Sequence, residues 1–81
     1  MVIDPKNLPL LRQTVFELIE QRGAHGATCD EIEAELDLSH QCASPRCTEL
    51  HQKGLIVDSG RRRVTRNGRR ACVYISRSTL Q

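Results

Sequence analysis

The spacing of apolar residues changes once along this chain, from helical before Gly54 to strand-like after it. Before Gly54, apolar residues recur every three or four positions in three separate segments. After it, two short β-branched runs flank a stretch rich in arginine. With 81 residues, the chain is long enough for one small core. We therefore expect a single domain over residues 1–81, of mainly helical α+β class: three helices followed by a two-stranded hairpin.

The first helix is predicted over residues 8–22. Its apolar stripe consists of Leu8, Leu11, Val15, Leu18 and Ile19. Asn7 is a suitable N-cap, and Pro9 fits the first turn, where a missing N–H costs nothing. Residues 1–7 precede this helix as an N-terminal arm.

The second helix is predicted over residues 28–37, with 29–36 as its helical turns. Thr28 and Glu31 form a capping box, in which the hydroxyl accepts from the Glu31 amide and the carboxylate reaches back. Ile32 and Leu36 give this helix one apolar face.

The third helix is predicted over residues 39–53, with Ser39 as its cap and Gly54 as its end. Ala43, Cys47 and Leu50 form its buried stripe. Pro45 leaves two alternatives open, because an interior proline removes a helical hydrogen bond. Either the helix is kinked there, or residues 40–43 form a looser turn and Ser44 caps the helix proper.

A β-hairpin is predicted over residues 55–75, with strands at 55–57 and 71–75, turn signals at 58–60 and 67–68, and a frayed tail at 76–81. Residues 60–70 contain no acid and six arginines: Arg61, Arg62, Arg63, Arg66, Arg69 and Arg70. Such a cluster repels itself, and a polyanion would relieve that repulsion. The alternatives are a solvated tip, or a pair between Asp58 and either Arg69 or Arg70.

Charge is unevenly divided along the chain. Residues 1–38 contain three basic and eight acidic side chains, a net of −5, whereas residues 39–81 contain nine basic and two acidic ones, a net of +7. A basic half attached to an acidic half indicates a face that binds a polyanion in one orientation.

The third helix has a polar face opposite its buried stripe. At about 100° per residue, that face contains Gln41, Ser44, Pro45, Thr48 and Gln52. Gln, Ser and Thr can contact base edges in a major groove, although the same face is also compatible with simple solvation. Arg46 falls on the flank, where it reaches a phosphate or pairs with the acidic second helix. His40, just after the cap, can contact a phosphate.

Two segments of the chain resemble known winged-helix proteins. Thr28-x-x-Glu31-Ile32-x-x-x-Leu36-x-Leu38-Ser39, with Ala43-Ser44 and Leu50-x-x-x-Gly54-Leu55-Ile56, resembles the core motif of MarR-like bacterial regulators. The run from Ser59 to Tyr74 resembles the wing of small phage- and prophage-encoded proteins. Pro45 departs from the polar or basic residue usual there.

The resemblance implies a winged helix-turn-helix domain that binds double-stranded DNA. The third helix would enter the major groove, and the wing would contact the backbone or minor groove. The candidate DNA contacts are His40, Gln41, Ser44, Arg46, Thr48, Gln52, Arg61, Arg62, Arg63, Arg66, Asn67, Arg69 and Arg70. We expect a small transcriptional regulator or a phage DNA-transaction accessory factor. The alternatives are a winged-helix module that binds a host or phage protein, and recognition of double-stranded RNA by shape.

Other classes find little support in the sequence. It contains no HExxH, phosphate-binding loop or nucleophile elbow, so we expect no enzyme activity. The four cysteines include no CxxC pair, and Cys47 with His51 is only a weak metal signal, so we expect no metal and no cofactor. No apolar run suits a membrane span or a secretory signal, which favours the cytoplasm of a bacterium or of a phage-infected host. We expect a monomer or weak homodimer.

Overall fold

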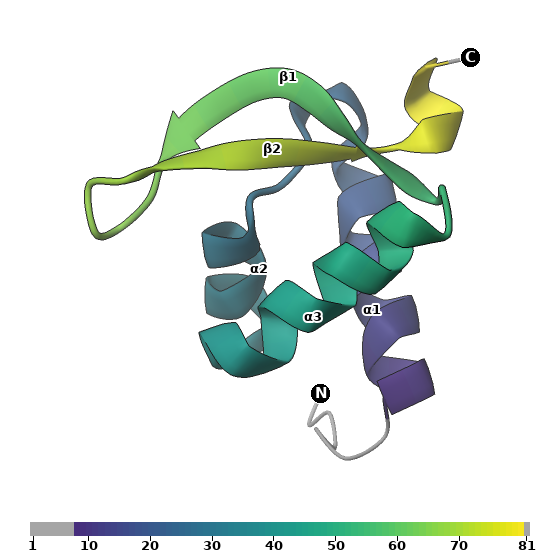
Figure 1. Ribbon diagram of the computed structural model, residues 1–81, viewed down its shortest axis with the longest axis horizontal. Helices are drawn as coiled ribbons and strands as arrows, with labels where there is room; N and C mark the ends of the chain where they lie inside the picture. Colours follow the sequence, from purple (N-terminus) through teal and green to yellow (C-terminus); the bar gives the residue numbers. More distant parts are fainter. Residues whose placement is uncertain (1–7, 81) are drawn as a thin grey trace.

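The computed structural model describes residues 8–80, and side chains from residue 8 to residue 79. Its elements are α1 (Leu8–Arg22), the short 3-10 helix η1 (Gly23–His25), α2 (Cys29–Leu36), α3 (His40–Gln52), β1 (Ile56–Val64), β2 (Arg70–Ser76) and the 3-10 helix η2 (Arg77–Leu80). The three α-helices pack beneath an antiparallel hairpin (Figure 1). The predicted mainly-α α+β class is confirmed, and the layout is compatible with a winged helix. No helix within residues 8–80 is long and apolar enough to cross a membrane.

The core lies where the three helices meet the hairpin. The helices contribute Leu11, Val15 and Ile19 from α1, Ile32 from α2, and Ala43, Cys47 and Leu50 from α3. Ala27, just before α2, and Ile56, Val73 and Ile75 of the hairpin complete the set of buried apolar residues. The buried stripes predicted for the second and third helices are therefore confirmed at Ile32, Cys47 and Leu50. Leu36 is only half-buried, at the edge of this core.

Helix α1 has the predicted bounds. Leu8, however, was placed on the buried stripe and is 41% exposed. The first turn of α1 lies at the end of the molecule away from the hairpin, so nothing from β1 or β2 covers it (Figure 1). The predicted arm at residues 1–7 and the Asn7 cap lie outside the described residues.

The predicted capping box forms at the start of α2. The Thr28 hydroxyl accepts a hydrogen bond from the Glu31 amide at 3.1 Å. The return contact from the Thr28 backbone to the Glu31 carboxylate contributes to the lowered pKa of that carboxyl, which arginines also bind. The helix ends at Asp37, which adopts a left-handed conformation with φ of 53°.

Helix α3 runs through Pro45 as one helix, so the alternative in which Ser44 begins the helix is wrong. Ser39 occupies the N-cap position, but its side chain makes no capping hydrogen bond. Its carbonyl accepts the amides of Cys42 and Ala43. Pro45 is exposed, so its ring meets solvent rather than the core.

The strands of the hairpin are longer and its tip is shorter than predicted. Strand β1 continues through the expected turn at residues 58–60, which is instead an irregularity in the register between Asp58 and Arg62. Gly60 has a φ of 84°, and its amide bonds to the Asp58 carboxylate at 2.8 Å. Arg61, Arg62 and Arg63 are therefore strand residues, and only residues 65–69 form the tip.

Two contacts outside the hairpin tie it to the helices. Ala27 and Tyr74 exchange both backbone hydrogen bonds at 2.9 Å, so the segment before α2 pairs with β2. Residues 77–80, expected to be a frayed tail, form η2, and the Arg77 amide donates to the Leu55 carbonyl. The first contact fixes how the hairpin lies relative to α2, and the second extends the pairing of the hairpin beyond Ile56 and Ser76.

Candidate nucleic-acid interface

The outer face of α3 is polar and contains no acid. Gln41, Thr48 and Gln52 are exposed, and Ser44 is half-buried beside Pro45, as the helical spacing predicted. Among residues 8–79, the one side-chain hydrogen bond on this face is local, from the Thr48 hydroxyl to the Ser44 carbonyl at 3.2 Å. Within the described residues, the Gln41 and Gln52 amides have no side-chain partner, so they are available to an external hydrogen-bonding surface.

His40 begins α3 and contacts α2. Its Nδ1 donates to Oε2 of Glu33 at 3.0 Å, while its side chain remains 72% exposed. The predicted phosphate contact therefore has an internal competitor, although the exposed ring can still meet a ligand at its other nitrogen.

Arg46 differs most from its predicted position. It was expected on the flank of α3, but its side chain is 9% exposed. Its Nη2 donates to Oε2 of Glu49 at 3.1 Å, and its Nε lies 2.8 Å from Oε1 without the alignment of a hydrogen bond. Arg12 of α1 also binds Glu49, at 3.1 Å. Arg46 thus helps join α3 to α1, and the predicted pair with the second helix is wrong.

Arg63 of β1 binds Glu31 of α2. Its Nε and Nη2 donate to the two carboxylate oxygens at 2.8 and 2.9 Å, and both side chains are about three-quarters buried. Arg22 of α1 donates to the same carboxylate at 3.1 Å. Burial opposes the ionisation of Glu31, but the hydrogen bonds and charge of Arg63, with the charge of Arg22, outweigh it, so the pKa of Glu31 lies below its usual range.

Arg66, at the hairpin tip, binds the next acid of α2. Its Nε donates to Oδ1 of Asp30 at 2.8 Å, and its backbone amide donates to Oδ2 at 3.2 Å. The hydrogen bond from Arg66 keeps the pKa of Asp30 below its ordinary value. Because Arg66 remains 60% exposed, this pair is a surface contact.

The remaining β1 arginines also have partners. Arg62 donates to Asp58 at 3.2 Å, so the pair predicted between Asp58 and Arg69 or Arg70 is replaced by a pair within β1. Arg61 donates to the carbonyls of Ala24 and His25 in η1. Four of the six arginines therefore already have partners in α2, η1 or Asp58, which relieves part of the repulsion that was expected to favour a polyanion.

Arg69 and Arg70 are the exceptions. Both are exposed, and neither guanidinium has a partner among residues 8–79. Asn67 is also exposed at the tip, where its backbone N–H donates to the Thr65 hydroxyl at 3.3 Å. The free positive charge of the wing is therefore concentrated where β2 begins.

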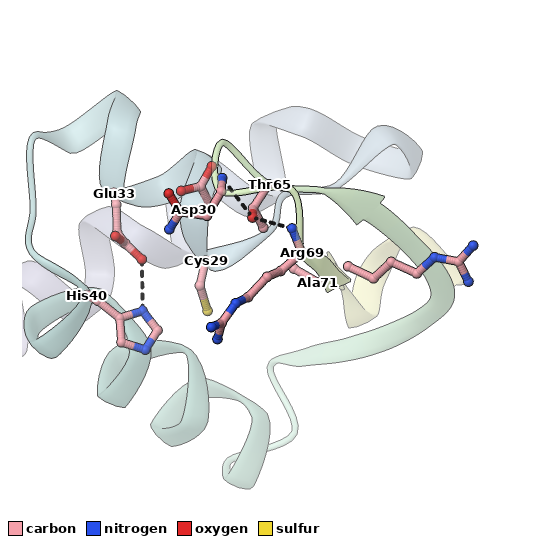
Figure 2. Close-up of a pocket in the computed structure, with 9 residues that line it drawn as sticks. Cys29, Asp30, Glu33, His40, Thr65, Arg69 and Ala71 are labelled. Atoms are coloured by element: carbon pink, nitrogen blue, oxygen red, sulfur yellow. Dashed lines mark hydrogen bonds and ion pairs between the residues drawn. The ribbon is translucent and has the colours of Figure 1, made fainter.

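A pocket joins this part of the wing to the start of α3. It has a volume of about 360 Å³ and is lined by Cys29, Asp30, Glu33, His40, Thr65, Asn67, Arg69, Arg70 and Ala71. Figure 2 shows the bonded pair of His40 and Glu33 on one side, Thr65 and Arg69 on the other, and the sulfur of Cys29 between them. The start of α3 and the two unpaired arginines thus border the same hollow.

No group of three or more His, Cys, Asp or Glu side chains within the described part of the chain is arranged to hold a metal ion. Cys47 is buried, and Cys29, Cys42 and Cys72 are half-buried free thiols. His51, paired with Cys47 in the weak metal signal, stacks at a tilt against Tyr74 instead, with ring centroids 5.9 Å apart.

Sequence reasoning missed the contribution of α2 to this surface. Sequence reasoning gave Glu31 a capping role alone and gave Asp30 and Glu33 no partner, yet all three carboxylates bind groups from the wing or α3. The opposite charges of the two halves of the chain were the available signal. The chain matches no model of a protein family, no curated protein and no solved structure.

Proposed function

We propose that this chain binds double-stranded DNA, with α3 in the major groove and the start of β2 on the phosphate backbone. The observation that supports this most strongly is the shared border of the pocket. His40 at the start of α3 and the unpaired Arg69 and Arg70 line it together. A single duplex surface could therefore contact the helix and both free cations at once.

The chemistry of α3 favours contact with base edges. Gln can bond bidentately to adenine, and Ser or Thr hydroxyls can serve several bases. Gln41 and Thr48 are exposed on a face that contains no acid, which suits a groove lined by phosphates. The only Phe and Tyr of the chain are half-buried, which disfavours a stacking platform for single strands.

The arginines of the wing have two roles in this proposal. Arg63 and Arg66 hold the wing against α2, whereas Arg69 and Arg70 supply phosphate contacts and the charge that attracts DNA. Arg61, Arg62 and Asn67 lie nearby as secondary contacts. A small regulator or a phage DNA-transaction accessory factor, the classes implied by the resemblance to MarR-like and prophage proteins, would use such a surface.

A mobility-shift experiment tests the proposal. The protein is titrated against a random-sequence duplex, the corresponding single strand and a duplex RNA at the same salt concentration. Preference for the DNA duplex, weakened by added salt, is the expected result. Binding to none of the three would contradict the proposal and favour a protein partner, and preference for duplex RNA would favour recognition by shape.

A further inference from the structure

Two of the four cysteines contact each other where α2 packs against α3. Cys29 is the first residue of α2, and Cys47 lies on the inner face of α3 with 1% of its surface exposed. Cys29 packs against the core cluster to which Cys47 belongs. The two thiols lie close enough that the Cys47 side chain lowers the pKa of Cys29. A half-buried sulfur therefore lies next to a buried one.

The pocket gives a small reagent access to Cys29. This residue lines the pocket of about 360 Å³, and Figure 2 shows its side chain directed into that space. A peroxide molecule is little larger than water and fits there. Cys47 is almost fully buried and does not line the pocket, so Cys29 is the accessible thiol of the pair.

The surroundings assign different roles to the two sulfurs. The hydrogen bond from Cys47 lowers the pKa of Cys29, and the nearby His40 adds to this effect, while burial and Glu33 oppose it. A position at the start of a helix also favours a thiolate. The hydrogen bond to Cys29 and burial raise the pKa of Cys47, which stays protonated.

We propose that Cys29 and Cys47 form a thiol pair that a peroxide oxidises to an intramolecular disulfide between α2 and α3. The Cys29 thiolate attacks one peroxide oxygen, the O–O bond breaks, and a sulfenic acid and, after protonation, one water form. The Cys47 sulfur then attacks the Cys29 sulfur, its proton leaves with the hydroxyl as a second water, and the S–S bond forms. Two electrons pass from the two thiols to the peroxide.

The other two cysteines provide internal comparisons. Cys42 is half-buried like Cys29 but has no thiol partner among the described residues. Burial and the hydrogen bond to Asp58 raise the pKa of Cys72 to about 11, which suppresses its thiolate. Neither should react as Cys29 does.

Peptide mapping of the full chain tests the proposal. The reduced protein is treated with one equivalent of hydrogen peroxide, and the remaining thiols are blocked. Trypsin then divides the cysteines among three peptides: 23–46 contains both Cys29 and Cys42, 47–53 contains Cys47, and 71–77 contains Cys72. The expected product is monomeric, lighter by two hydrogen atoms, with 23–46 linked to 47–53. Cys42→Ser should give the same link at the parental yield, because Cys42 takes no part.

Cys29→Ser should abolish the link, and a circular dichroism spectrum checks its fold. Should that variant fail to fold, the maps of the parent and of Cys42→Ser still decide the question. Four results would each overturn the proposal. Two of them are a dominant link to residues 71–77 and a disulfide-bonded dimer. The other two are loss of the link in Cys42→Ser and a sulfenic acid that persists at Cys29 while Cys47 stays free.

Discussion

Arg63 of β1 and Glu31 of α2 form a two-bonded ion pair, at 2.8 and 2.9 Å, between residues 32 positions apart in the sequence. The same guanidinium donates to the carbonyls of His25 and Gly26, so it fastens the wing to the segment that precedes α2. An arginine that the sequence assigned to DNA contact is thus part of the structural frame that holds the wing in place.

Replacing Glu31 by Gln should destabilise the protein by about 1–2 kcal/mol at neutral pH. The substitution removes the carboxylate charge that accepts the hydrogen bonds of Arg63, at a site where both side chains are largely buried. The pKa of Glu31 is lowered by folding from its ordinary value of 4.5. Its ionised form therefore stabilises the folded state above that pH, and this contribution disappears as the pH falls through the lower folded value. Denaturant unfolding over a pH series measures both effects.

Glu20→Gln is the matched control, since Glu20 is exposed and has no ion-pair partner among the described residues. Its unfolding free energy should follow that of the parent at every pH. Equal behaviour of the Glu31 and Glu20 variants would show that the pair with Arg63 contributes nothing.

A second prediction concerns Gly26, which has a φ of 67° and lies against β2. An added Cβ would collide with the Tyr74 carbonyl and lie 2.8 Å from side-chain carbons of Val73 and Ile75. Gly68 has a similar φ of 77° but open space around it. Gly68→Ala should cost about 1–2 kcal/mol from backbone strain alone, and Gly26→Ala distinctly more. Thermal unfolding compares them, and equal losses would mean that the segment before α2 does not approach β2 as described.

The sequence predicted the fold well because its signals are local. The stripes of α1, α2 and α3 and the two β-branched runs each lie within a few turns or one strand, so helical and strand spacing determine them. Pro45 was ambiguous because an interior proline removes a helical hydrogen bond, whereas Ala43 and Cys47 on either side of it are both buried in the core.

The candidate site was predicted less well because its contacts are distant in sequence. The pairs from Arg63 to Glu31 and from Arg66 to Asp30 span more than thirty residues and depend on how the hairpin lies over α2. The bridge between Ala27 and Tyr74, which sets that arrangement, involves one residue on each side and leaves no pattern in the sequence. A count of charges therefore could not separate Arg69 and Arg70 from the other arginines.

A third prediction tests α3 as the element that contacts bases. Gln41→Ala and Thr48→Ala should each reduce discrimination between a selected duplex and a random one by about 1–3 kcal/mol. Gln21→Ala is the control, because Gln21 is exposed on α1 and lies outside the proposed interface. Competition binding measures the preference. Unchanged preference in both α3 variants would remove α3 from the proposed role.

The most direct test of DNA binding through the unpaired arginines is the dependence of affinity on salt. Each phosphate contact adds about 0.9 to the slope of log affinity against log salt on B-form DNA. Replacing Arg69 and Arg70 together by Ala should flatten that slope by roughly 2 units on random and selected duplexes alike. Replacing Arg61 and Arg62 removes the same charge from side chains that already have partners, and should flatten it less. Equal slopes for the parent and the Arg69 and Arg70 variant would contradict the account.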